Sequence, residues 1–153
     1  MLAEGGHTLL YGGSNLGTMG VLSSGAMEHG GRVVGVIPTL FSEEIISSQV
    51  VTRLVRVASM AERKEYLIAH SDAFVVLPGG IGTLDELFEV MVANQLLQVD
   101  KPVVLLNIDG FYNSLTAQLE TMRRHGYLRS EGNMHVMTSV EDCMAFLNAT
   151  GKA

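Results

Sequence analysis

The sequence predicts an α/β fold in which helices cover a doubly wound sheet of parallel strands. Short apolar runs of the length of a buried strand alternate with segments whose apolar residues recur at helical spacing. Glycine-rich turns join two of these runs to the helical segments that follow them. Alternating strands and helices form βαβ units, and such units build a parallel sheet with helices on its faces.

Strands and helices alternate along the whole chain. Strands are expected at residues 7–11, 32–37, 50–57, 72–77, 102–107 and 134–137. Helices are expected at residues 18–29, 60–70, 84–98, 111–125 and 140–148, with a loop that holds a short helical turn at residues 39–49. Ser59 and Glu62 form a capping-box pattern at the start of the second helix. Because no linker or repeat interrupts this order, we expect a single domain over residues 1–153.

The composition narrows the class of protein. The chain has 153 residues, of which 47% are hydrophobic, so it is apolar enough to bury a core. A net charge of −6 and the lack of any block of Lys or Arg argue against a nucleic-acid partner. No apolar run approaches the ~20 residues of a membrane span, and no signal peptide is visible, so we expect a cytoplasmic protein with no membrane partner. Cys143 is the only cysteine, which leaves no internal disulfide and disfavours a cysteine-based metal site.

The segment LPGGIGT at residues 77–83 is the strongest functional signal. It connects the apolar run at residues 72–77 to a helical pattern, and it holds Gly79, Gly80 and Gly82. Glycines at such a turn let the backbone approach an anion, and the free N–H groups of the first helical turn point at that anion. The segment therefore predicts a phosphate site at the carboxyl edge of the sheet.

A simpler interpretation of this segment is a tight turn. Thr83 as the N-cap and Glu86 three residues later would form a capping box without any ligand. That interpretation explains Thr83 and Glu86, but it does not explain three glycines, because one glycine suffices for most turns. We therefore favour the phosphate site.

Further candidate residues follow other strands of the predicted sheet. Gly12 and Gly13 end the first strand at the same edge, where ligands of open α/β sheets bind, although close packing of a tight turn would also explain them. Arg63 and Lys64 begin the helix after the third strand and can face this edge, but in isolation Arg63 has the pattern of a surface residue. Glu44 is either part of a solvated acidic turn or a carboxylate that reaches ligand hydroxyls. The histidines lack metal-ligand spacing, so neither a metal site nor a cofactor is expected.

The nonapeptide PGGIGTLDE at residues 78–86 resembles the PGGxGTxxE signature of the Lonely Guy proteins. These are cytokinin riboside 5′-monophosphate phosphoribohydrolases, which are often labelled lysine decarboxylases. Further segments resemble the family in the same order, and the resemblance covers nearly the whole chain: residues 34–38, Arg63-Lys64, and residues 71–74, 101–103 and 106–112. The resemblance implies a Rossmann-like, nucleotide-binding domain.

The resemblance also implies a reaction and a set of site residues. The reaction is hydrolysis of the N-glycosidic bond of an adenine-type or cytokinin-type nucleoside 5′-monophosphate, which yields the free base and ribose 5-phosphate. The family's catalytic residues fall on Arg63 and Glu86, and its phosphate turn falls on Gly80, Gly82 and Thr83. With their neighbours, the expected substrate-binding residues are Gly12, Gly13, Glu44, Lys64, Gly79, Gly80, Ile81, Gly82 and Thr83. The family needs no cofactor and forms homodimers.

The chain departs from the family pattern in several places. It is expected to lack the family's first strand and most of its first helix, and Ser14 stands where a third glycine is common. Val92-Ala93-Asn94 replaces the more common Thr-Trp-Ala. The family's dimer interface lies near the signature helix, where a stripe of Leu87, Met91 and Leu96 either faces a partner or belongs to the core.

Two interpretations compete with the glycosidase: a non-catalytic protein that binds a phosphate ligand, and a truncated, inactive chain that still dimerises. A non-catalytic phosphate-ligand protein, such as a molybdenum-cofactor carrier, shares the fold and a related glycine-rich signature. The presence of both Arg63 and Glu86 favours the enzyme, because hydrolysis needs them and carriage does not. Lysine decarboxylation is rejected, because no lysine lies in a recognisable motif for a Schiff-base cofactor.

Overall fold

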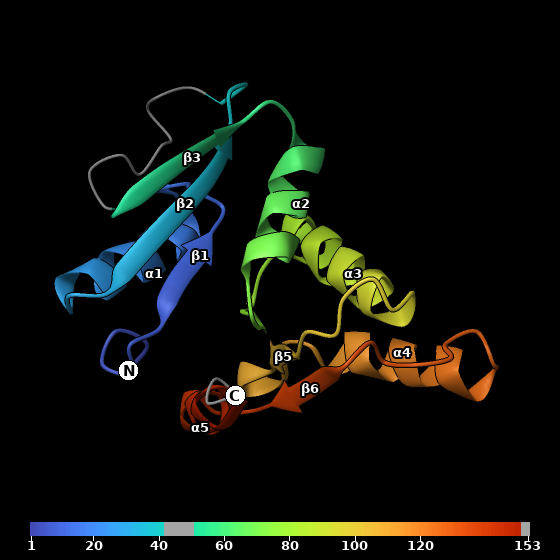
Figure 1. Cartoon of the computed structure of the whole chain (residues 1–153). Helices are drawn as coiled ribbons and strands as arrows, with labels where there is room; N and C mark the ends of the chain where they lie inside the picture. Colours follow the sequence, from blue (N-terminus) through green and yellow to red (C-terminus); the bar gives the residue numbers. More distant parts are fainter. Residues whose placement is uncertain (42–50, 151–153) are drawn as a thin grey trace. The chain divides into compact units, whose positions relative to one another are not determined.

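The computed structural model describes residues 1–41 and 51–150, and it has the α/β class that the sequence predicts (Figure 1). The chain divides into two compact units, Met1–Ser71 and Asp72–Ala153. Each unit contains a three-stranded sheet whose strands are all parallel. A single domain over residues 1–153 therefore stays a prediction. In the described ranges, no helix is both long and apolar enough to cross a bilayer.

The first unit is built around the central strand of its sheet. Its elements are β1 (Thr8–Tyr11), α1 (Gly17–Glu28), β2 (Arg32–Pro38), β3 (Arg53–Val57) and α2 (Met60–His70). The strand order is β1-β2-β3. Helix α1 contacts β1 and β2, and α2 contacts β2 and β3. The core of this unit therefore lies on β2, where Val33, Val36 and Ile37 are at most 2% exposed.

Helix α2 begins with the capping box that the sequence predicts. The Ser59 hydroxyl accepts a hydrogen bond from the N–H of Glu62 at 3.1 Å. The Glu62 carboxylate reaches back and accepts the N–H of Ala58 at 2.8 Å, one residue before the cap. Two donors near the helix start are thereby satisfied, which fixes the first turn that carries Arg63.

The second unit is built in the same way around a buried strand. Its elements are β4 (Phe74–Val76), α3 (Ile81–Gln95), β5 (Val103–Leu106), α4 (Asn113–Arg124), β6 (Met134–Met137) and α5 (Val140–Thr150). The order is β4-β5-β6, so β5 is central, and its four residues are at most 3% exposed. A run that is apolar at every position is what a strand covered on both faces requires.

Helix α3 begins earlier than the sequence predicts. Gly80, in an extended conformation, is its N-cap, and the helix starts at Ile81. The N–H groups of Thr83 and Leu84 both donate to the carbonyl of Gly80, at 3.1 and 3.2 Å. The predicted capping box of Thr83 and Glu86 is therefore wrong, because Thr83 already lies inside the first turn. Glycine is an acceptable N-cap, so the glycines do not delay the helix.

Asn94, near the end of α3, is one of the residues by which this chain departs from the family pattern, and the structure gives it a role. Asn94 is buried, and its amide nitrogen donates to the carbonyls of Lys101 at 2.8 Å and Gly132 at 2.6 Å. Its amide oxygen accepts the N–H of Lys101 at 3.0 Å. Asn94 thereby ties the helix to the segments that enter β5 and β6. Leu97, with a φ of 56°, lies beyond the helix end at Gln95.

The predicted stripe on α3 divides between core and surface. Leu87 and Met91 are 1% and 2% exposed and belong to the core, whereas Leu96 is 63% exposed. Beyond its first residue, Ile81, the exposed large apolar side chains of this helix are Phe88 and Val92, and the C-cap Leu96 follows at the same interval of four residues. Residues four apart lie on the same face of a helix, so these three form one apolar stripe.

Candidate anion site

The glycine-rich signature forms the turn between β4 and α3. Ile81 is the first residue of the helix and is 87% exposed. Within the described residues, no backbone hydrogen bond uses the N–H of Ile81 or Gly82, as expected for the first turn of a helix. These amides and the positive end of the helix dipole point out of the same exposed end of α3. Such an end is suited to bind an anion such as a phosphate.

The three glycines of the turn have different structural needs. A Cβ at Gly79 would collide with the Thr83 hydroxyl, so packing within the turn requires glycine there. A Cβ at Gly80 or Gly82 would meet nothing within 4 Å, and neither residue has a positive φ. The fold itself would therefore accept alanine at both positions. Close approach of a ligand to the backbone is a physical reason for glycine at both.

Glu86 stands one turn further along the same helix. It lies four residues after Gly82, which places it on the face of Gly82 and about 6 Å further along the axis. Its side chain is half-buried. The arrangement puts a carboxylate beyond an anion-binding helix end. A ligand with a phosphate at one end and a reacting bond at the other can span this interval.

Two residues that the sequence analysis did not single out support the turn. Tyr112 is 3% exposed, and its hydroxyl donates to the carbonyl of Leu77 at 2.6 Å. Burial raises the pKa of Tyr112, and a backbone hydrogen bond from Gly79 opposes that rise. Asn107, at the end of β5, accepts the N–H of Tyr112 at 2.7 Å. The only sequence signal was that both residues lie in the segment at residues 106–112 that resembles the family.

In the first unit, the structure brings Arg63 together with the turn after β1. Arg63 is only 8% exposed, so its interpretation as a surface residue is wrong. Its Nε donates to the carbonyl of Val36 at 3.2 Å. A Cβ at Gly12 would collide with the Arg63 guanidinium, so Gly12 makes room for this side chain. The capped start of α2 aims Arg63 at β2 rather than at solvent.

The remaining predicted site residues outside the signature are Gly13, Lys64 and Glu44. Gly13 has a φ of +76°, and a Cβ there would lie 3.1 Å from that of Ile37, so the backbone and its packing both require glycine. Lys64 is half-buried beside Arg63. Glu44 lies outside the described residues. The structure thus groups Gly12, Gly13 and Arg63 in the first unit, and Gly79–Thr83 and Glu86 in the second.

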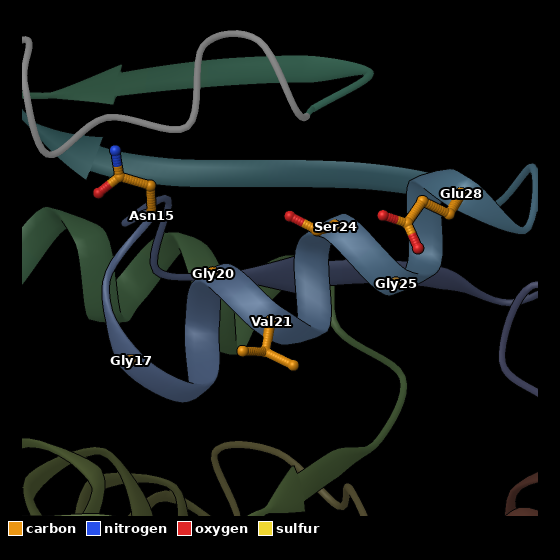
Figure 2. A pocket seen from close by; sticks show the side chains of 7 residues that line it. All are labelled: Asn15, Gly17, Gly20, Val21, Ser24, Gly25 and Glu28. Carbon is orange, nitrogen blue, oxygen red and sulfur yellow. The ribbon is translucent and has the colours of Figure 1, made fainter.

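The described residues also contain an open pocket on helix α1, with a volume of about 700 Å³ (Figure 2). The residues that line it are Asn15, Gly17, Gly20, Val21, Ser24, Gly25 and Glu28. Among the described residues that line it, Glu28 alone is charged, and it is acidic. None of the predicted site residues that the structure describes lines this pocket, and the acidic Glu28 does not suit a phosphate. Elsewhere in the described ranges, no three His, Cys, Asp or Glu side chains gather as metal ligands.

Comparison with known proteins identifies a family and a set of relatives. Residues 19–149 match the family model described as possible lysine decarboxylase. The chain is 41% identical over 131 residues to the cytokinin riboside 5′-monophosphate phosphoribohydrolase LOG5 of Arabidopsis thaliana, covering 86% of this chain and 57% of that protein. It is 45% identical over 122 residues to the probable phosphoribohydrolase LOGL2 of Oryza sativa subsp. japonica, covering 79% and 50%. The chain thus spans about half the length of these relatives.

Solved structures of proteins that are named for a different function share the fold of this chain. The molybdenum cofactor carrier protein of Chlamydomonas reinhardtii superimposes with a TM-score of 0.71 and 28% identity, covering 99% of this chain and 82% of that one. The molybdenum cofactor binding protein of Rippkaea orientalis gives a TM-score of 0.71 and 27% identity, covering 97% and 80%. One fold therefore carries both a named hydrolase function and a named carrier function.

Proposed function

Because this chain belongs to the possible lysine decarboxylase family, the family of the LOG proteins, we propose that it hydrolyses the N-glycosidic bond of nucleoside 5′-monophosphates. The expected substrates are adenine-type or cytokinin-type nucleotides, and the products are the free base and ribose 5-phosphate. The support is identity of 39–46% to relatives that are named as phosphoribohydrolases. A nucleotide substrate also supplies a phosphate, an anion of the kind that the exposed start of α3 is suited to bind.

One observation carries the proposal. Gly80 and Gly82 are glycines that the fold does not require, at a helix end with exposed amides, and Glu86 stands one turn beyond. A simple turn explains neither glycine, and a phosphate ligand explains both. The carboxylate has no role in holding a phosphate, since like charges repel. Glu86 is therefore assigned to the sugar rather than to the phosphate.

The proposed chemistry follows from these assignments. As the bond between C1′ and the base nitrogen breaks, its electron pair goes to the base and positive charge builds on the ribose ring. A carboxylate beside the ring stabilises that charge or orients the water whose oxygen bonds to C1′. The base takes up a proton as it leaves. The family resemblance assigns a catalytic role to Arg63 as well, and a bidentate contact of its guanidinium would make lysine a poor substitute.

The second candidate function is carriage of a phosphate-bearing ligand without cleavage. The structural likeness to the molybdenum cofactor carriers favours it as the alternative. Both functions need the anion site at Gly80 and Gly82. Only hydrolysis needs the carboxylate of Glu86, so this residue distinguishes the two.

The test is base release from AMP and from N6-isopentenyl-AMP, followed by chromatography, with wild type beside Glu86→Gln. We expect the variant to lose at least ~100-fold in turnover, because catalysis by a positioned carboxylate contributes about 10²–10⁴-fold. Asp85→Asn, on the exposed side of the same turn, is the matched control and should retain activity. If folded wild type binds AMP but releases no base, the carrier function replaces the hydrolase.

We also propose that the protein forms a homodimer through the α3 stripe of Phe88, Val92 and Leu96, which are 40%, 50% and 63% exposed. An apolar stripe of this kind on a helix is typical of a protein–protein contact. The α3 stripe follows directly from the anion site along one helix, so a partner bound there would lie close to the substrate.

A further inference from the structure

We propose that Tyr112 is a positioning residue of the anion site, whose phenol holds the turn at residues 77–80 so that the amides of Ile81 and Gly82 point at the phosphate. The inference rests on the proposed function, and it adds a residue from the segment between β5 and α4 to a site otherwise formed by β4 and α3. Tyr112 acts on the ligand only through the main chain of the turn.

The phenol of Tyr112 contacts the main chain on both sides of Pro78. Its hydroxyl donates to the carbonyl of Leu77 at 2.6 Å, and the N–H of Gly79 donates to the phenolic oxygen. Pro78 itself has no N–H, which removes one hydrogen bond by which the turn could have held itself. One buried side chain therefore replaces the internal hydrogen bonding of this turn.

The backbone of Tyr112 is itself held to the sheet. Asn107 follows β5, is 7% exposed, and accepts the N–H of Tyr112 at 2.7 Å. The Asn107 amide nitrogen donates to Asn113 at 2.8 Å, and its own N–H donates to the carbonyl of Met137 at 2.7 Å. Hydrogen bonds through Asn107 thus tie the backbone of Tyr112 to the sheet, and the side chain of Tyr112 ties the turn to that backbone.

The backbone before Tyr112 is shaped to deliver the ring to this place. Asp109 and Gly110 have φ values of 51° and 73°, so the chain turns sharply between β5 and α4. The adjacent Phe111 is 56% exposed, whereas Tyr112 is 3% exposed. The turn therefore directs the second of two neighbouring aromatic rings inward, where its hydroxyl meets the carbonyl of Leu77.

The ionisation state of the phenol fits this role. A buried phenol stays protonated at neutral pH, and it must be protonated to donate to a carbonyl. At 2.6 Å, the contact with Leu77 lies within the range of O–H···O hydrogen bonds. Removal of the hydroxyl leaves the carbonyl of Leu77 and the N–H of Gly79 without this partner. The turn then has more than one way to orient its amides.

The test is Tyr112→Phe, which removes only the hydroxyl. We expect KM for AMP to rise about tenfold while kcat changes less than threefold, because the phenol orients the phosphate end rather than the reacting bond. Affinity for inorganic phosphate, measured by calorimetry, should fall by a similar factor. Amide hydrogen exchange of residues 79–82 should become faster. Tyr127→Phe, in the same unit and 85% exposed, is the matched control and should behave as wild type.

A lower melting temperature with unchanged KM and phosphate affinity would overturn the inference, because Tyr112 would then be only structural. A fall in kcat with unchanged KM would overturn it as well. If Tyr112→Phe does not fold, Asn113→Ala removes the exposed end of the same hydrogen-bond chain and should raise KM in the same direction by a smaller factor. If wild type shows no hydrolysis, the hydrolase proposal fails, while the phosphate and exchange measurements still decide the role of Tyr112.

Discussion

Substitution of Gly12 by alanine tests whether the turn after β1 exists to make room for Arg63. A Cβ at this position would overlap the Arg63 guanidinium and would also lie 3.0 Å from the Met19 sulfur. Gly12 has no positive φ, so the backbone accepts alanine without strain. Most of the effect of Gly12→Ala should therefore come from displacement of the arginine, which is the nearer of the two side chains.

The magnitude follows from the contact that the displacement breaks. The hydrogen bond from Arg63 Nε to the carbonyl of Val36, at 3.2 Å, involves a charged donor, and such a bond contributes about 1.5–3 kcal/mol. Replacing glycine with alanine stiffens the unfolded chain and offsets about 0.4–1 kcal/mol of that loss. We expect a net decrease of about 1–2 kcal/mol in the free energy of unfolding. At this chain length the melting temperature should fall by roughly 2–8 °C.

The assay is thermal unfolding followed by circular dichroism, together with base release from AMP. Gly25→Ala on the neighbouring helix α1 is the control, because a Cβ there meets nothing within 4 Å. That variant should be more stable than wild type by about 0.5–1 kcal/mol, the usual gain for alanine inside a helix. The reasoning also requires that Gly12→Ala have little effect in an Arg63→Ala background, as a double-mutant cycle would show.

Wild-type stability and activity in Gly12→Ala would refute this account. It would mean that Arg63 can occupy another position without loss, and that its burial is not needed. An equal decrease with and without Arg63 would refute it in a different way, because the alanine would then act through the turn itself.

Three further predictions concern other parts of the molecule. Gly82→Ala should leave the melting temperature unchanged or higher, because a Cβ at this position meets no other atom within 4 Å. Affinity for AMP, measured by calorimetric titration, should fall at least tenfold. Unchanged affinity would remove the basis for the anion site. Asn94→Ala should lower the free energy of unfolding by about 2–4 kcal/mol, because the backbone groups of Lys101 and Gly132 lose their hydrogen-bond partner. A loss below ~1 kcal/mol in urea unfolding would contradict the role of Asn94 in tying α3 to these segments. Val92→Asp should shift the protein from dimer to monomer in a sedimentation experiment, and the folded monomer should keep its Tm. A dimer that persists in this variant would place the interface elsewhere.

The raised pKa of Tyr112 predicts how stability depends on pH. The folded state holds the phenolic proton more tightly than the unfolded state, whose pKa is near the usual value of 10.0. The stabilisation is therefore complete below pH 10 and is lost as the pH rises through the folded-state pKa. Wild type should lose stability above pH 10 more steeply than Tyr112→Phe in denaturant titrations. Parallel pH profiles would show that the phenol ionises equally easily in both states.

Local sequence signals determined the elements of this protein. The apolar run Val103–Leu106 has the composition of a strand buried on both faces, and β6 (Met134–Met137) has the bounds that were predicted. Ser59 and Glu62 start α2 as their spacing indicates. Each of these signals depends on neighbours within a few positions, which a chain displays directly. The signature at residues 78–86 likewise predicted the turn between β4 and α3, while anion binding at this turn stays a prediction.

Tertiary structure decided which side chains these elements place together. Arg63 is held by Val36, 27 positions earlier, and a surface helix pattern cannot reveal such a contact. Tyr112 reaches Leu77 across 35 positions, and Asn94 meets Gly132 across 38. Burial and hydrogen bonding of this kind depend on the packing of strands and helices that are remote in sequence, so no local pattern encodes them. The need for glycine at Gly12 and Gly79, and its absence at Gly80 and Gly82, likewise emerged only once the neighbouring atoms were in place.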